Sequence, residues 1–474
     1  MSSAASFRTE NDLLGTLEVP AQAYYGIQTL RAVNNFRLSG VPISHYPKLV
    51  VGLAMVKQAA ADANRELGQL SEAKHAAISE ACARLIRGDF HEEFVVDMIQ
   101  GGAGTSTNMN ANEVIANIAL EAMGHNKGEY QYLHPNNDVN MAQSTNDAYP
   151  TAIRLGLLLG HDALLASLDS LIQAFAAKGV EFSHVLKMGR TQLQDAVPMT
   201  LGQEFRAFAT TLGEDLQHLK LLAPTLLTEV NLGGTAIGTG INADPKYQAL
   251  AVKRLAIISG HPLTPAADLI EATSDMGAFV LFSGMLKRTA VKLSKICNDL
   301  RLLSSGPRTG INEINLPARQ PGSSIMPGKV NPVIPEAVNQ VAFEVIGNDL
   351  ALTMAAEGGQ LQLNVMEPLI AYKIFDSIRL LTRAMDMLRE LCIDGITANE
   401  ARCRELMENS IGLITALNPY IGYENATRIA KVALESGRGV LELVREEQLL
   451  DEATLADILR PENMIAPRLV PLQS

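Results

Sequence analysis

One stretch of the sequence combines residues suited to acid–base and anion-binding chemistry with a backbone that cannot be helical. It begins at Gly322, ends at Asn331 and reads Gly-Ser-Ser-Ile-Met-Pro-Gly-Lys-Val-Asn. Between positions 306 and 335, ten of thirty residues are Gly or Pro, which break helices and strands alike. Irregular segments of this length inside compact domains are usually functional or disordered. Because this one carries two serines, a lysine and three large apolar residues, we interpret it as an active-site loop.

A phosphate-binding loop is the main alternative for a segment of this kind, and its spacing does not fit. That motif has four residues between its first Gly and the Gly-Lys pair, and a Ser or Thr follows the lysine. Here five residues separate Gly322 from Gly328, and Val330 follows Lys329. The segment is therefore not predicted to bind a nucleotide phosphate.

The loop resembles the signature of the aspartase/fumarase superfamily of lyases, Gly-Ser-Ser-x-Met-Pro-x-Lys-x-Asn. Three segments more than a hundred residues away resemble other motifs of that superfamily, namely residues 102–112, 144–147 and 189–195. The similarity covers essentially the whole chain, from Asn11 to Asn425. Gln192 resembles the aspartase branch, because fumarases carry a histidine there. Residues 271–275, 312–317 and 359–368 also resemble the aspartase versions of these segments.

The resemblance implies a mainly α, three-domain fold whose central bundle of five long helices assembles into a tetrameric core. Apolar periodicity agrees with long helices that begin beyond Pro150 and then cover about residues 201–222, 285–305, 335–356 and 368–391. Several of them are apolar over more than one stripe, which favours burial against copies of the same chain. We predict domains at residues 1–144, 145–398 and 399–474, and the second domain carries the loop.

The activity that the resemblance implies is the reversible elimination of ammonia from L-aspartate to give fumarate. Loss of the C3 proton gives a dianionic, enediolate-like intermediate, so fixed donors must face the developing charge. The resemblance assigns Ser323 as the base and Lys329 as a second catalytic residue. A serine is a poor base unless donors and cations stabilise its alkoxide. The substrate-binding candidates are Thr105, Ser106, Ser144, Thr145, Asn146, Thr191, Gln192, Ser324 and Asn331.

Simpler structural interpretations stay open for several polar residues. Thr191 and Gln192 would serve as caps if a helix starts near them, and His134 would make a local hydrogen bond in a turn. The glycines of residues 101–104 precede a helix predicted from about 109 to 123. Arg31 and Arg308 stay open between salt bridges and carboxylate binding.

Composition restricts the partners and the cellular compartment. A net charge of −12 argues against nucleic acid and anionic membranes as partners, and no apolar run predicts a signal peptide or membrane span. The four scattered cysteines indicate reduced thiols in a cytoplasmic protein. The sequence has no His-Glu-x-x-His motif, so we expect no zinc site, and it has no Gly-x-Gly-x-x-Gly dinucleotide fingerprint. The resemblance implies no required cofactor, with Mg²⁺ left open as an activator, and a homotetramer whose active sites are shared by three subunits.

Two other functions compete with ammonia elimination. The first is fumarate hydratase, in which Gln192 would be irrelevant to specificity. The second is a non-catalytic oligomeric scaffold of the same fold. The intact set of Ser323, Lys329 and Asn331 argues against the scaffold.

Ser323→Ala tests the assignment of the base. We expect the variant to keep the fold and to lose nearly all turnover, because it lacks the hydroxyl assigned as the proton acceptor. Steady-state rates and circular dichroism of both proteins check this. Near-normal activity in the variant would remove Ser323 from the mechanism.

Overall fold

The computed structural model describes residues 6–322 and 324–465 of the 474-residue chain. They form two compact units, each built from several chain segments. Unit 1 contains residues 1–165, 217–288 and 343–381, and unit 2 contains residues 166–216, 289–342 and 382–474. This grouping does not test the predicted domain boundaries after residues 144 and 398, which stay a prediction.

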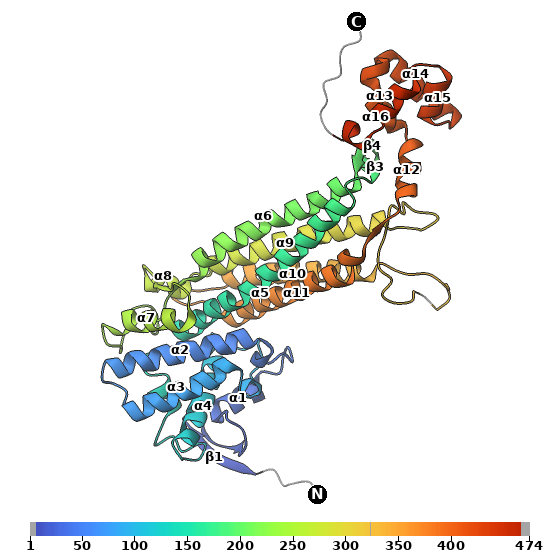
Figure 1. Ribbon diagram of the computed structural model, residues 1–474. Helices are drawn as coiled ribbons and strands as arrows, with labels where there is room; N and C mark the ends of the chain where they lie inside the picture. Colours follow the sequence, from blue (N-terminus) through green and yellow to red (C-terminus); the bar gives the residue numbers. More distant parts are fainter. Residues whose placement is uncertain (1–5, 323, 466–474) are drawn as a thin grey trace. The chain divides into compact units, whose positions relative to one another are not determined.

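Helices dominate the chain, and five of them are long. These are α5 (Thr145–Glu181), α6 (Leu201–Leu227), α9 (Gly277–Leu303), α10 (Val333–Glu357) and α11 (Glu367–Leu391). Figure 1 shows them running alongside one another. Polar side chains bridge them within each unit. In unit 1, Ser283 on α9 donates to Asp349 on α10 at 2.8 Å. In unit 2, Asn339 on α10 donates to Ser294 Oγ on α9 at 2.9 Å. The predicted mainly α class and its five long helices are confirmed.

Apolar periodicity explains why these segments are helical and buried. Five large apolar residues of α5, spaced three, four or seven positions apart, are all fully buried: Leu157, Leu164, Leu168, Leu171 and Phe175. Burying a side chain of this size contributes roughly 1.5–3 kcal/mol before the entropy of ordering it is subtracted. By length and composition α5 could also cross a membrane, but half of its most apolar stretch is buried inside the protein, as in the core helix of a bundle.

Shorter elements complete unit 1. They are β1 (Phe7–Asp12), β2 (Gly15–Pro20), α1 (Ile27–Asn35), α2 (Pro47–Glu66), α3 (Glu72–Arg87), α4 (Thr105–Ala122), a π-helical turn (Pro135–Val139), β5 (Glu229–Val230), α7 (Tyr247–Ser259), β6 (Thr264–Pro265) and α8 (Leu269–Ser274). Strands β1 and β2 form an antiparallel hairpin, and β5 pairs with β6 in parallel.

Unit 2 adds two antiparallel strand pairs and a group of short helices. Its elements are β3 (Leu186–Thr191), β4 (Gln194–Thr200), β7 (Ile314–Asn315), β8 (Thr397–Ala398), α12 (Glu400–Glu408), α13 (Ile414–Ile421), α14 (Tyr423–Ser436), α15 (Val440–Glu446), α16 (Glu452–Ile458) and α17 (Pro461–Met464). Strand β3 pairs with β4, and β7 pairs with β8. The helices after α12 enclose an apolar core of their own, which includes Leu417, Ile429, Val444 and Leu455.

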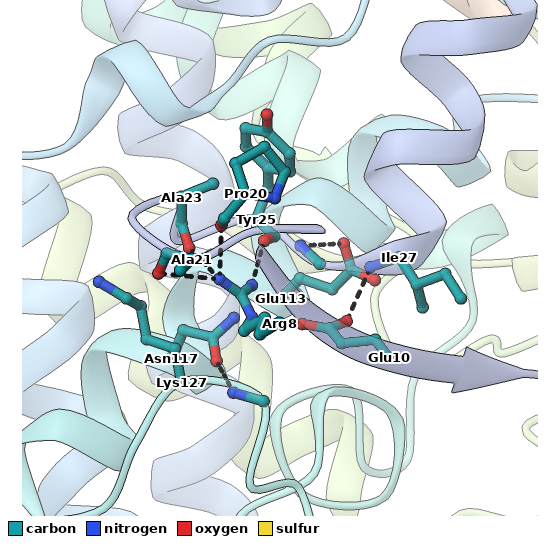
Figure 2. A network of polar contacts seen from close by, with 12 residues as sticks. Arg8, Glu10, Pro20, Ala21, Ala23, Tyr25, Ile27, Glu113, Asn117 and Lys127 are labelled. Atoms are coloured by element: carbon teal, nitrogen blue, oxygen red, sulfur yellow. Dashed lines mark hydrogen bonds and ion pairs between the residues drawn. The ribbon is translucent and has the colours of Figure 1, made fainter. Parts of the chain in front are cut away.

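Two buried carboxylates hold the start of α1. Glu113 on α4 accepts three backbone N–H groups, those of Gly26, Gln28 and Thr29, at 2.8, 2.9 and 3.1 Å. Glu10 on β1 accepts the N–H of Ile27 at 2.8 Å. Figure 2 shows Arg8 beside Glu10, with its guanidinium directed at carbonyl groups of the 20–25 segment. Burial raises the pKa of Glu113 to about 7, although these N–H donors favour its ionised form.

Candidate active site

The first predicted motif forms the start of α4. This helix begins at Thr105, so the predicted start near residue 109 is wrong, and Thr105 and Ser106 lie in its first turn. Gly104 precedes the helix with a φ of +88°, and a Cβ there would lie 2.2 Å from the ring of Tyr149. Only glycine fits both the left-handed backbone and this contact. The glycines precede the helix as predicted, but the predicted helix start is too late because the polar residues that follow the glycines already belong to the helix.

The second motif, residues 144–147, is organised by a buried carboxylate. Asp147 Oδ1 accepts the N–H of Ser144 at 2.9 Å, and its Oδ2 accepts the N–H groups of Gly233 and Thr235, both at 3.0 Å. Asp147 is fully buried, and burial raises its pKa to about 6 against the effect of the three N–H donors. The first turn of α5 is thereby tied to the 233–235 segment.

A proline inside α5 is accommodated by the same neighbourhood. Pro150 has no N–H, so the carbonyl of Asn146, one turn earlier, receives no bond from the helix itself. Asn231 Nδ2 donates to that carbonyl at 2.9 Å instead. The side chain of Asn146 in turn donates to the carbonyl of Ala236 at 2.7 Å. The carbonyl of Asn146 therefore has a hydrogen-bond donor despite the proline.

The third motif lies at the tip of the β3–β4 hairpin, and the interpretation of Thr191 and Gln192 as helix caps is wrong. Thr191 pairs with Gln194, which leaves Gln192 and Leu193 as a two-residue turn. Both turn residues are left-handed, with φ of +55° and +61°. This geometry usually takes Asn-Gly, and each bulky residue held there costs roughly 1 kcal/mol. Such strain concentrates at functional sites, because only the surrounding structure maintains it.

A buried ionic cluster holds the base of this hairpin. Lys187 and Arg190 on β3 both bind Glu313, at 2.8 and 2.9 Å, and Lys187 also binds Glu204. Glu313 is fully buried and directly precedes β7. Burial alone would lower the pKa of Lys187, but the charges of Glu204 and Glu313 outweigh it and raise that pKa. The cluster joins the hairpin to the first part of the Gly/Pro-rich loop, ahead of residues 322–331.

The Gly/Pro-rich loop connects α9 to α10 and is closed by its own backbone. Gly322 N–H donates to the carbonyl of Lys329 at 2.8 Å, and Lys329 N–H donates to that of Met326 at 3.2 Å. A Cβ at Gly322 would lie 2.4 Å from the Lys329 carbonyl oxygen. Ser324 and Lys329 are exposed and Asn331 is half-buried. Ser323, the predicted base, lies outside the described residues.

Comparisons with known proteins identify the group of enzymes to which these motifs belong. A family model described as a lyase matches residues 15–347, and one described as the fumarase C C-terminus matches residues 413–466. An aspartate ammonia-lyase from Pseudomonas fluorescens is 94% identical over 100% of this chain and 99% of its own. The chain belongs to the aspartase/fumarase superfamily. Another aspartate ammonia-lyase, from Escherichia coli (strain K12), is 58% identical over 98% of this chain and 97% of its own.

Solved structures of superfamily members share the fold. A fumarate lyase:delta crystallin from Brucella melitensis, bound to cobalt, is 61% identical with a TM-score of 0.94, over 98% of this chain and 100% of that one. A class II fumarase from Schistosoma mansoni is 35% identical with a TM-score of 0.90, over 97% of this chain and 99% of that one. The superfamily fold that the loop motif implied is confirmed.

The predicted superfamily site residues fall into two groups. The first group lies in unit 1, at the starts of α4 and α5, and consists of Thr105, Ser106, Ser144, Thr145 and Asn146. Within it, Asn108 Nδ2 donates to Thr145 Oγ1 at 3.2 Å, so the two helix starts are in direct contact. The second group lies in unit 2 and consists of Thr191, Gln192, Ser324, Lys329 and Asn331. The catalytic and binding roles of both groups stay predictions.

Three residues with open roles have clear partners or surroundings. Arg31 binds Asp12 through two bonds of 2.8 Å each, so it is a salt-bridge residue. His134 Nδ1 accepts the N–H of Asn136 at 3.0 Å at the start of the π-helical turn, which confirms the local hydrogen bond. Arg308 is exposed, and no ion pair joins it to another described residue.

Lys57 is the residue near the first group that the sequence analysis missed. It lies on α2, is fully buried, and its Nζ donates to Asn108 Oδ1 at 2.6 Å. Burial lowers its pKa to about 7, which the charge of Asp147 partly opposes. The one signal in the sequence was a lysine directly after the apolar run of residues 49–56, and that pattern is also typical of a surface lysine at the edge of a helix.

Gly322→Ala tests whether the closed form of the loop is needed for activity. The added Cβ would displace the Lys329 carbonyl, so we expect kcat/KM to fall about 100-fold, the usual effect of an ångström of misplacement in an active site. Thermal unfolding should not change, because the loop is exposed. Gly439→Ala is the matched control, because its Cβ would meet nothing closer than 3.9 Å. Wild-type kcat/KM in Gly322→Ala would show that loop closure is irrelevant.

Proposed function

We propose that the protein is an aspartate ammonia-lyase, which eliminates ammonia from L-aspartate to give fumarate and catalyses the reverse addition. The observation that carries this proposal is near-complete identity to proteins of that name, 94% for Pseudomonas fluorescens and 90% for Pseudomonas aeruginosa, over the full chain. The fumarase from Schistosoma mansoni is only 35% identical. The fumarate hydratase alternative is therefore less well supported.

The reaction breaks one C–H and one C–N bond and forms one double bond. Ser323 takes the C3 proton, and the electron pair moves onto the β-carboxylate, which becomes an enediolate-like dianion. The pair then forms the C2–C3 double bond as ammonia leaves from C2. The hydroxyls and amides at the starts of α4 and α5 supply neutral donors to the anion, and Lys329 supplies a positive charge. Because the reaction is not a net oxidation or reduction, it consumes no redox cofactor; we include Mg²⁺ only as an activator.

An apolar helix face that one chain leaves uncovered supports assembly into a homotetramer. Phe343, Leu350 and Met354 lie on one face of α10 and are each more than half exposed, at 62, 65 and 61%. Large apolar residues repeated on one helix face usually mark an interface. We propose that copies of this chain cover the face and that three subunits contribute to each active site. All four cysteines are free and buried, which supports a cytoplasmic location.

Mixing two inactive variants tests the shared sites. One chain carries Thr145→Val and the other Ser323→Ala, and the two are unfolded and refolded together. If different subunits supply the two residues, random mixing makes about a quarter of the sites intact, so activity should return to about that fraction of wild type. Each variant refolded alone is the control. A mixture no more active than the average of the two controls would mean that one chain supplies both Thr145 and Ser323 to each site.

The product formed from fumarate decides between the candidate functions. We expect the purified protein to form aspartate from fumarate only when ammonium is present, because the reverse reaction adds ammonia to the double bond. Chromatographic identification of the product with and without ammonium checks this. Malate formed without ammonium would make the protein a fumarase. If the protein forms neither aspartate nor malate, the scaffold is favoured.

A further inference from the structure

Lys57 is a buried cation whose hydrogen-bonding capacity is met entirely by neutral groups. Its three N–H donors reach three side-chain amide oxygens, those of Asn108, Asn140 and Gln143, at 2.6, 2.8 and 2.9 Å. No salt bridge joins it to any residue in the described part of the chain. A buried charge of this kind is costly, because no carboxylate balances it. A role in the reaction explains the charge better than a role in stability.

The ammonium determines which way the Asn108 amide faces. A lysine ammonium has donors and no acceptor, so the oxygen of Asn108 must face Lys57 and its NH₂ must face away. The NH₂ group then donates to Asn140 Oδ1 at 3.1 Å and to Thr145 Oγ1 at 3.2 Å. The reversed amide would set its NH₂ group against the ammonium, so the observed orientation is the only one that fits.

The direction of the Asn108 bond in turn constrains the hydroxyl of Thr145. Because Thr145 Oγ1 accepts from an NH₂ group that has no lone pair to offer, its own proton cannot point back to Asn108. Thr145 is the first residue of α5, where the positive end of the helix also favours an anion. Among the hydrogen bonds between described residues, Thr145 Oγ1 accepts one and donates none, so its proton is available to the carboxylate of a bound ligand.

We propose that Lys57 is a positioning residue that, through Asn108, directs the Thr145 hydroxyl proton toward a carboxylate of bound aspartate. This proposal rests on the proposed ammonia-lyase function. Bonds in such a chain polarise one another, so the charge of Lys57 also makes Thr145 a better donor as negative charge develops on the substrate. The effect should be larger in the transition state than in the substrate complex, and kcat should therefore change more than KM.

Asn108→Asp separates this role from a structural one, because the two predict opposite results. The new carboxylate would pair with Lys57 and relieve its unpaired charge, so the thermal unfolding temperature should stay the same or rise. The same carboxylate would accept the Thr145 proton and turn it away from the substrate. We expect kcat for aspartate deamination to fall about 100-fold, as for the loss of one oxyanion donor, with a smaller change in KM.

A double variant tests whether Asn108 acts through Thr145. Thr145→Val removes the hydroxyl and should lower kcat by a similar factor. Adding Asn108→Asp to Thr145→Val should lower it by no more than about twofold further, because the interaction is already lost. If the two losses multiply, Asn108 acts independently and the proposal is wrong. Should Asn108→Asp not fold, Asn108→Ala in the two backgrounds gives the same comparison, with a first loss of about tenfold.

Gln143→Glu is the matched control for the added charge. It places a carboxylate next to Lys57, but Gln143 makes no bond to Thr145. We expect kcat to fall less than about fivefold, far less than in Asn108→Asp. Equal losses in the two variants, or an Asn108→Asp enzyme within about threefold of wild type, would overturn the proposal. A wild-type protein that forms no fumarate from aspartate would instead overturn the proposed function.

Discussion

The first turn of α5 depends on one buried carboxylate, that of Asp147. Burying a carboxylate is costly, and here three backbone N–H donors offset that cost. Two of those donors come from residues more than eighty positions away, so the same bonds that stabilise the charge also hold the 233–235 segment against the helix. Asn231 donates to the Asn146 carbonyl, which Pro150 leaves without a donor within the helix. The irregular start of α5 is thus a rigid feature of the fold, and a rigid start is what fixed hydrogen-bond donors require.

Two buried lysines in this protein show two different uses of a buried charge. Lys187 binds two carboxylates, and their charges raise its pKa. Lys57 binds three amides, and burial lowers its pKa to about 7. The first arrangement joins two chain segments and keeps its charge balanced. When Lys57 is protonated, the second leaves a positive charge without a paired carboxylate beside a set of anion-binding candidates, in a protein whose total charge is −12. Local charge of this kind is what an anionic substrate needs on an acidic protein.

The second group of site residues is placed on irregular backbone that rigid elements support. Gln192 lies in a left-handed turn whose strands are joined to Glu313, and the loop beyond β7 is closed between Gly322 and Lys329. Neither the turn nor the loop buries much apolar surface of its own. Residues such as Ile325 and Val330 are exposed in the single chain, which agrees with a site that other subunits complete.

The sequence by itself determined the class of fold, the position of the long loop and the superfamily. Helical periodicity repeats every few residues and Gly/Pro density is local, so both can be read without knowing what packs against them. The tertiary structure decided the rest. The start of α4 depends on Tyr149, the hairpin at Thr191 depends on strand pairing, and the buried state of Lys57 depends on amides 51 to 86 residues away. The free energy of a buried polar group is determined by its partners. Because these partners are distant in the sequence, a short-range pattern cannot reveal them.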